Sequence, residues 1–424
     1  MLEDRFGNAL TTHSLTARDA YIDGVDKFLA AEHGVEDAFN NAIAADKYFA
    51  LAYVGIARSH QLFGKVKKAA EANGLARVYS IGLTNREVSH IKALGLLIEG
   101  KVSVAYKAIR SHLNEYPQDA MVAQTCAGVF GLIGFSGQPG RIAEQLAFTT
   151  KLLPYYGNDW WFLGQHAFAQ VEAGQIGPAT ETIERSLAGN PRSAHGAHNR
   201  THIYYEAGET ETGYNYLNEW RRGYDKGGAL HCHLSWHIAL WALERGEIDT
   251  MWEVIDADVA PDNASGPPLN VLTDNAAFLY RAELAGLEIP LYRWKSISNY
   301  AQDNFPSTGN AFVDVHAALA HARAGNREAL DKIISEAKGP AEDIVRLIAE
   351  AFKAISAENW VKASDHLTAI IAGLERIGGS CAQRDLIEYA LLDALIKQGK
   401  ISEANLLLTT RRPLKVQAHA VCGL

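Results

Sequence analysis

The sequence predicts an all-α protein built as a right-handed α-α superhelix of about ten helix-turn-helix repeats. The first observation is a series of glycine-centred turns that recur every 34 to 40 residues, or at twice that interval. These turns lie at Gly64, Gly100, Gly174, Gly208, Gly246, Gly286, Gly325 and Gly399. The second is a set of three prolines, Pro117, Pro154 and Pro191, at a constant spacing of 37 residues. The third is the lack of sustained period-two alternation, so strands are not expected.

Each repeat is expected to contain a first helix, a tight glycine turn, a second helix and a break at proline or polar residues. Glycine suits the left-handed conformation that follows many helix C-termini, and proline cannot continue a helix beyond its first turn. The two intervals of double length are filled near residues 137–144 and 356–363. The longest irregular segments, 257–270 and 301–310, either fold over the concave face or accommodate longer repeats.

The period and the positions of Ala, Gly and Pro resemble those of tetratricopeptide repeats, over about residues 30–412. The resemblance implies one continuous solenoid domain over residues 1–424, with a concave groove lined mainly by the first helices. The composition agrees with a globular protein of this kind, since 48% of the residues are hydrophobic and 21% are charged.

Charge and cysteine usage restrict the partners and the compartment. The net charge of −9 argues against nucleic-acid binding, which needs a positive footprint. The N-terminus has no basic segment followed by an apolar run, and no window reaches 18 consecutive apolar residues. The four cysteines are far apart and form no C-x-x-C pair. We therefore expect a cytoplasmic protein with neither nucleic acid nor a membrane as a partner, and a homodimer is left open.

Two stretches, HGAHNRTHIYYEAGE (195–209) and HCHLSWHIALWALERGE (231–247), hold six of the sixteen histidines. His198 and His202 are spaced i, i+4, which puts both rings on one helix face, and so are His233 and His237. Counted back from the glycine turns, all four lie on the first helices of adjacent repeats, within an arc of about 100°. The predicted site is therefore in the histidine-rich central repeats, about residues 155–326.

The same count places further polar residues on first helices, with the aspartates out of phase with the histidines. These candidates are Asp274, Asp314, His316 and His166. Trp236, next to His237, either walls a pocket or belongs to the core between helices. Arg281, which follows Tyr280, either recognises a carboxylate or phosphate or is a charge at a helix end. Cys232 either packs as a small apolar residue or acts as a nucleophile, and packing is favoured.

Three uses of the four central histidines remain open. Two i, i+4 pairs on adjacent helices could bind a divalent metal. However, neither pair contains the Glu of H-E-x-x-H, and no cysteine or carboxylate pair lies between them at metal-ligand spacing. Acid-base chemistry without a cofactor is therefore preferred over a metal site. The third use, ordinary burial with a hydrogen-bond partner, weakens when several histidines share neighbouring helices.

Four segments resemble the tetratricopeptide repeat protein 38 family: HNRTH, CHLSWHIALWALERGE, LTDNAAFLYRAELAG and FVDVHAALAHARAG, in this order and spacing. The residues that match the family pattern are His198, His202, Cys232, His233, Trp236, His237, Asp274, Tyr280, Arg281, Asp314 and His316. The sequence departs from the pattern at Tyr204 and Tyr205, where the family usually has His and Glu, and at Val313, where it has Asn. The resemblance implies an all-helical, intracellular solenoid, and it supplies no reaction.

The favoured function is a small-molecule site in the concave groove, with hydrolase-type or lyase-type chemistry. The catalytic candidates are His198, His202, His233, His237, Asp274, Asp314 and His316. The substrate-binding candidates are Trp236, Tyr280, Arg281, Cys232 and His166. Histidine suits general acid-base work near neutral pH, and a carboxylate partner fixes its tautomer. The alternative is a non-enzymatic scaffold that binds a peptide in the groove.

Overall fold

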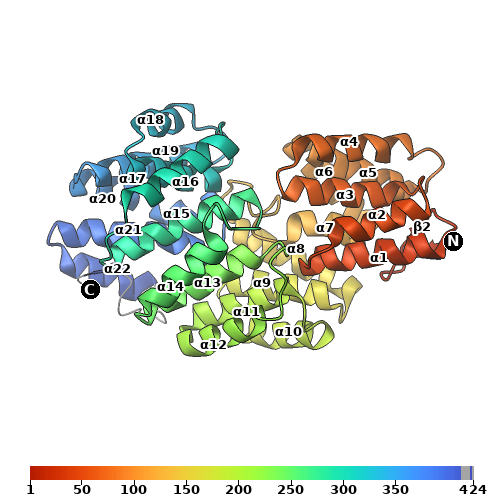
Figure 1. The fold of residues 1–424 in the computed structure, drawn as a ribbon, viewed down its shortest axis with the longest axis horizontal. Coiled ribbons are helices and arrows are strands. Elements are labelled where there is room, and N and C mark those ends of the chain that lie inside the picture. The colour runs from red at the N-terminus through yellow and green to blue at the C-terminus, as the bar shows by residue number, and fades with distance from the viewer. Residues whose placement is uncertain (412–420, 423–424) are drawn as a thin grey trace.

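The structure confirms the predicted all-α, right-handed superhelix of helix pairs. It is a computed structural model that describes residues 1–411 and 421–422. Antiparallel helix pairs stack one on the next along the chain, from α1 (Leu15–Ala30) to α22 (Ile401–Arg411), as Figure 1 shows. Within the described residues, no helix is long and apolar enough to cross a membrane.

The helices follow one another along the chain in three consecutive groups, over residues 15–156, 160–259 and 268–411. The first group is α1 (Leu15–Ala30), α2 (Val35–Ala45), α3 (Ala50–Leu62), α4 (Val66–Val78), α5 (Asn85–Ile98), α6 (Val102–Glu115), α7 (Ala120–Ala127) and α8 (Arg141–Tyr156). The second is α9 (Trp160–Glu172), α10 (Ile176–Gly189), α11 (Ala194–Ala207), α12 (Thr210–Arg221), α13 (His231–Glu244), α14 (Ile248–Val254) and the π-helix η1 (Ile255–Val259). The third is α15 (Pro268–Leu284), α16 (Leu291–Asn304), α17 (Ala311–Ala324), α18 (Arg327–Glu336), α19 (Glu342–Ser356), α20 (Trp360–Ile370), the 3-10 helix η2 (Ile371–Ile377), α21 (Cys381–Lys397) and α22 (Ile401–Arg411).

The turn glycines behave as the sequence predicts. All eight have positive φ angles, from 69° at Gly64 to 92° at Gly286. This is the left-handed region that glycine enters without a Cβ clash. Between α19 and α20 the same place is taken by Glu358, with a φ of 54°. The prediction for Pro154 is wrong, because this proline lies within the last turn of α8 instead of in a break.

A short hairpin precedes the first helix, so the prediction that the chain contains no strands is wrong. β1 (Leu2–Glu3) pairs antiparallel with β2 (Ala9–Leu10). Two residues per strand are too few to produce the period-two pattern on which the prediction was based.

The helices divide into an inner and an outer layer. In α9, α13, α15 and α17 almost every residue is buried, so these helices have no polar face. Outer helices such as α10 and α18 bury only one stripe of side chains. A helix that is buried on all sides belongs to the interior of the fold. The first helix of each central repeat therefore lies in the inner layer, and so do the histidines that it carries.

The last inner helix closes the superhelix. In α21 every residue from Ala382 to Leu392 is buried, and the helix packs against α11 and α15 as well as α20. The loop before α21 also meets the first helix group, where Arg141 Nη2 donates to the Gly379 carbonyl at 2.6 Å. The groove is therefore bounded by early, central and late repeats together.

Candidate metal centre

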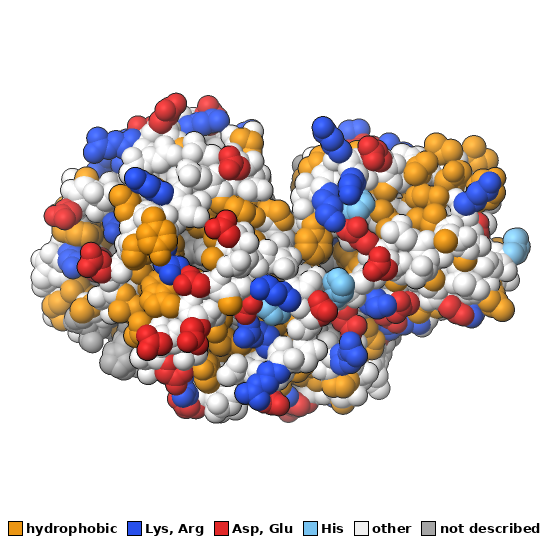
Figure 2. All heavy atoms as spheres, in the orientation of Figure 1, with side chains coloured by type: hydrophobic (Ala, Val, Ile, Leu, Met, Phe, Trp, Pro, Cys, Tyr) orange, Lys and Arg blue, Asp and Glu red, His pale blue; other side chains and the backbone are white. Residues whose placement is uncertain are grey.

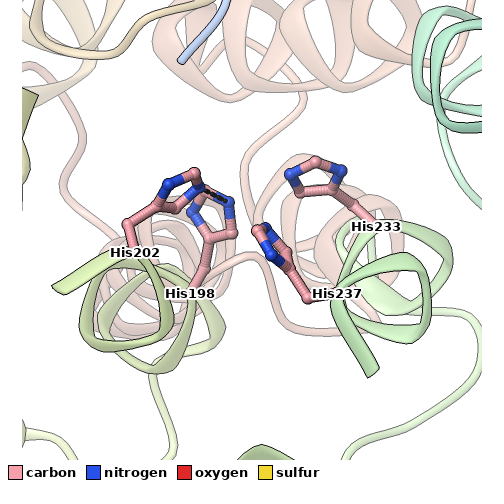
Figure 3. Close-up of side chains that lie close together, drawn as sticks. All are labelled: His198, His202, His233 and His237. Atoms are coloured by element: carbon pink, nitrogen blue, oxygen red, sulfur yellow. Dashed lines mark hydrogen bonds between the residues drawn. The ribbon is translucent and has the colours of Figure 1, made fainter. Parts of the chain in front are cut away.

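Two neighbouring inner helices bring four histidines together. α11 begins at the Ser193 cap, whose side chain accepts a hydrogen bond from the Gly196 N–H. One helical turn separates His198 from His202 on α11, and one turn separates His233 from His237 on α13. In Figure 3 the four rings point toward one another across the space between the two helices. The sequence predicted this grouping from spacing alone.

The ring nitrogens of these four histidines lie close enough to share one ion. One nitrogen from each ring can be chosen so that all four lie within 4.8 Å of one another. The His202 Nε2 and His198 Nε2 atoms are 2.9 Å apart. The ring centroids of His198 and His233 are 4.9 Å apart, and those of His202 and His237 are 4.8 Å apart. We call these four residues the four-histidine centre.

Polar neighbours orient two of the rings. His233 Nδ1 lies 3.0 and 2.9 Å from the two carboxylate oxygens of Asp274 on α15. The carboxylate accepts a hydrogen bond from the Nδ1–H group of His233, which leaves the lone pair of the neutral ring on Nε2. His198 Nδ1 lies 3.3 Å from Asn199 Oδ1, and Asn199 is itself fixed by a 2.9 Å bond to the Gly164 carbonyl. Such outer contacts are what histidine ligands need to present the other nitrogen to a metal.

The centre is buried, and burial disfavours the charged form of His198 and His237. His202 is 0% and His237 1% exposed, while Asp274 is 1% exposed. Burial, followed by the neighbouring histidines, holds the pKa of His198 and of His237 well below the usual range. Burial raises the pKa of Asp274, and the nearby His233 lowers it in part. A neutral imidazole keeps a lone pair available for an ion, so the low pKa values of His198 and His237 favour metal binding.

Aromatic side chains wall the centre. The Trp236 ring stacks on His233, with centroids 5.2 Å apart and an interplanar angle of 13°. Phe168 of α9 packs against His202 from the other side, at a centroid distance of 4.9 Å. These contacts restrict the rotamers of the rings and keep water from the back of the site.

The centre opens into a groove of about 1590 Å³. His198, His202 and His233 line the groove, whereas His237 lies behind them. The irregular segments that the sequence singled out also reach it, through residues 267–270, 304–305 and 309–310. The segment 301–304 is, however, the end of α16. Figure 2 shows the molecule notched between the part that carries α3–α6 and the part that carries α16–α19.

The structure does not bring the other predicted catalytic residues to the centre. Asp314 accepts a 2.9 Å bond from the Gly309 N–H at the start of α17, and burial raises its pKa to about 6. His316 Nδ1 donates to the Phe312 carbonyl at 2.7 Å, and burial lowers its pKa to about 4. Neither residue lines the groove. Both belong to the packing of α17.

The predicted substrate-binding residues also lie outside the groove lining. Arg281 donates to the Tyr205 hydroxyl at 3.1 Å and to the Ala382 carbonyl of α21, so its charge serves to join three inner helices. The Tyr280 ring packs edge-on against Phe352. These two predictions assumed that the groove is open beside α15, but α21 packs against α15 there.

Two of the three remaining candidates, Cys232 and His166, are packing residues. Burial raises the pKa of the Cys232 thiol well above its usual range, and the residue lies under Gly266, where an added Cβ would come within 2.9 Å of Cys232 Cβ. His166 Nδ1 lies 3.0 Å from Thr149 Oγ1, and burial lowers its pKa. Trp236 is the exception among the substrate-binding candidates, because it walls the centre although it does not reach the groove.

Sequence reasoning missed several residues of the site. Asn199 and Phe168 contact the histidines directly, and Asn270 and Gln383 line the groove. Only Asn270 could have been found from the sequence, because it precedes the candidate Asp274 by one helical turn and so lies on the same helix face. An Asn or Gln on an inner helix gives no other sign of its role.

The fold and the site define a tetratricopeptide-like solenoid with a buried histidine centre on its groove. The sequence matches no protein-family model. Among solved structures, the human IFIT1 dimer with m7Gppp-AAAA is similar over 95% of this chain and 90% of that chain, at 13% identity and a TM-score of 0.45. Yeast Tom70 is similar over 95% of this chain and 94% of that chain, at 15% identity and a TM-score of 0.37. At these identities the likeness concerns the repeat fold alone, and the particular resemblance to the tetratricopeptide repeat protein 38 family stays a prediction.

Proposed function

We propose that this chain is a ligand-binding solenoid protein that holds a divalent transition-metal ion in the four-histidine centre and presents it to an occupant of the groove. The observation that carries the proposal is the convergence of four buried imidazoles within 4.8 Å, with Asp274 behind one of them. The proposal reverses the order of preference from the sequence, which placed a metal below cofactor-free acid-base chemistry.

The need for a cation follows from the lone pairs of the four rings. Buried polar nitrogens cost free energy unless they have a partner. The Nε2 atoms of His198 and His202 satisfy each other through a 2.9 Å contact. His237 Nε2 is buried and has no hydrogen-bond partner among the described residues. A bound cation would satisfy it and its neighbours at once.

The donor set favours some metals over others. Imidazole nitrogen suits zinc, copper, nickel and iron, whereas calcium and magnesium take oxygen ligands. Zinc bonds histidine at about 2.0–2.1 Å, so the nitrogens of a tetrahedral site are about 3.3 Å apart. The ring nitrogens here lie within 4.8 Å of one another, so the most widely separated pair needs to approach by up to about 1.5 Å around an ion.

The groove side of the centre supports binding as the function. Three of the four rings line the groove and His237 lies behind them, so an occupant can approach the ion from the open side. A volume of about 1590 Å³ exceeds the roughly 300–1,000 Å³ of ordinary small-molecule pockets. It suits an elongated ligand, whether a long small molecule or a peptide segment of the kind that solenoid grooves bind.

The second candidate is a metal-assisted hydrolase or lyase, and the contact between His233 and Asp274 favours it. An ion held by all four imidazoles would need a fifth position for water, or would have to release one ring; a metal with such an open position lowers the pKa of bound water and generates a nucleophile near neutral pH. The carboxylate of Asp274 strengthens His233 as a ligand and fixes its tautomer. Turnover of a groove ligand in the metal-loaded protein, and loss of turnover on chelation, would distinguish this candidate from binding alone.

A metal titration tests the proposal. Protein freed of metal by a chelator and titrated with Co²⁺ should bind one equivalent per chain and develop the visible bands of a nitrogen-ligated ion. His237→Ala should lose this binding while the helical circular dichroism stays unchanged. His195→Ala is the matched control, because His195 lies on α11 and lines the groove but is not one of the four. Equal Co²⁺ affinities of the two variants would overturn the proposal.

A further inference from the structure

We infer that Arg58 binds an oxyanion, a carboxylate or phosphate group, at one end of an elongated ligand whose other end lies at the four-histidine centre. The inference rests on the proposed function for the metal end only. The evidence for the oxyanion site comes from Arg58 of α3 and its neighbours, and it does not depend on the metal proposal.

Arg58 lines the groove without a carboxylate partner. Its guanidinium donates to the side-chain oxygen of Gln61 and, at 3.1 Å, to that of Gln124. It forms no ion pair within residues 1–411 and 421–422, and its Nε atom is buried there without a hydrogen-bond partner. The Phe28 ring lies below it, 6.0 Å from the guanidinium carbon. Burial lowers the pKa of Arg58 to about 10, and no nearby carboxylate offsets that effect.

A partly buried guanidinium bonded only to neutral amides is prepared to bind an anion. Its partners are fixed in orientation, since the Gln61 amide nitrogen donates to the Leu97 carbonyl at 3.1 Å and so turns its oxygen toward Arg58. Two of the carboxylates that line the groove have partners of their own. Glu36 pairs with Lys65 at 2.8 Å, and Glu144 accepts a bond from the Tyr106 hydroxyl. Arginine recognises carboxylate and phosphate through two parallel N–H donors, which suits this unused charge.

The lining of the same groove also offers unused donors. Gln383 is 3% exposed, its oxygen accepts from the Ser380 N–H, and its amide nitrogen is buried without a partner among the described residues. The amide nitrogen of Asn270, at 4% exposure, is in the same state. Both residues line the groove. A ligand rich in acceptor oxygens would satisfy these donors along its length.

The separation of the two ends sets the length of the ligand. Arg58 reaches Gln124 on α7, α7 contacts α9, and α9 contacts α11 with its histidines. Two such helix spacings of about 8–10 Å each separate α7 from α11. Because three helices in contact need not lie in one line, a ligand that engages both ends spans at most about 16–20 Å between helix axes, less the reach of the side chains.

The test uses decanedioate, a ten-carbon dicarboxylate, against Co²⁺-loaded and metal-free protein by calorimetry. Decanedioate should bind the Co²⁺-loaded wild type and perturb the Co²⁺ bands. Arg58→Gln should weaken binding by about tenfold or more, since a hydrogen bond to a charged group is lost. Arg58→Lys keeps the charge and should recover part of it. Arg110→Gln is the matched control, because Arg110 is another arginine without an ion pair in the described structure but does not line the groove.

Two further arms separate the sources of the oxyanion and the two proposals. Decyl phosphate tests whether a phosphate group is preferred. A pentapeptide with a free C-terminus, compared with the same peptide amidated, tests a peptide carboxylate. Weaker binding of either anion to Arg58→Gln than to the wild type supports the inference. If Co²⁺ fails to bind, metal-free protein should still bind these anions through Arg58, so the metal proposal falls alone. Equal affinity of Arg58→Gln and Arg110→Gln for every probe, or no binding of any probe to the wild type, would overturn the inference.

Discussion

Replacing Asp274 with asparagine tests how the protein supports the four-histidine centre. The carboxylate oxygens of Asp274 lie 2.9 and 3.0 Å from His233 Nδ1, and the residue is 1% exposed. Asp274→Asn keeps the size of the side chain and removes its charge. It therefore weakens the bond that directs Nε2 of His233 toward the other three rings without leaving a cavity.

The expected magnitude comes from that one hydrogen bond. A hydrogen bond to a charged group contributes about 1.5–3 kcal/mol. At 1.4 kcal/mol for each factor of ten, the metal affinity should fall by about 10- to 150-fold. Loss of an outer carboxylate partner typically costs about 10- to 100-fold in metal affinity, which agrees with this range.

Competition with a chromophoric chelator measures the change in affinity for Zn²⁺ or Co²⁺. Asp314→Asn is the matched control, since Asp314 is a buried carboxylate on an inner helix that accepts from the Gly309 N–H instead of from a histidine. Its metal affinity should equal that of the wild type. The reasoning is refuted if Asp274→Asn binds metal as tightly as Asp314→Asn does while both variants keep the wild-type helical content.

Three further predictions concern the stability of the fold. Burial lowers the pKa of His321 to about 4, so below pH 6.5 only the unfolded state takes up its proton and the folded state loses stability. Denaturant titrations should therefore show that, between pH 7 and pH 5, the free energy of unfolding of His321→Gln falls by about 2 kcal/mol less than that of the wild type, and an equal fall in both proteins would contradict this. Glu358 has a φ of 54°, so Glu358→Gly should raise the free energy of unfolding by about 1 kcal/mol, and a lower melting temperature would contradict this. The Tyr205 hydroxyl donates to the buried Asp385 at 2.7 Å, so Tyr205→Phe should cost about 1–3 kcal/mol, and an unchanged denaturation midpoint would count against that contact.

The repeat architecture could be predicted because its signals are local. A left-handed turn after a helix needs glycine, and all eight predicted turn glycines have positive φ angles. The pairing of the histidines was also a local matter, since i, i+4 spacing fixes one face and the turn glycines fix the helix. The position of Asp274 was the uncertain step, because its repeat is longer, and the structure brings it to His233.

The errors come from contacts between distant parts of the chain. Arg281 and Tyr280 were substrate-binding candidates, with a helix-end charge as the alternative for Arg281, but α21, about a hundred residues later, packs against their helix and accepts a hydrogen bond from the arginine. Nothing local to either residue indicates that packing. Arg58 went unnoticed for the same reason, because its lack of a carboxylate partner is visible only when α3 and α7 are side by side.

The most direct test of the central claim is an anomalous difference map from a crystal of Zn²⁺-loaded protein, collected at the zinc edge. We predict one strong peak between α11 and α13, about 2.0–2.1 Å from a ring nitrogen of each of His198, His202, His233 and His237. A map with no peak among these four rings, from protein soaked in Zn²⁺ at neutral pH, would contradict the account.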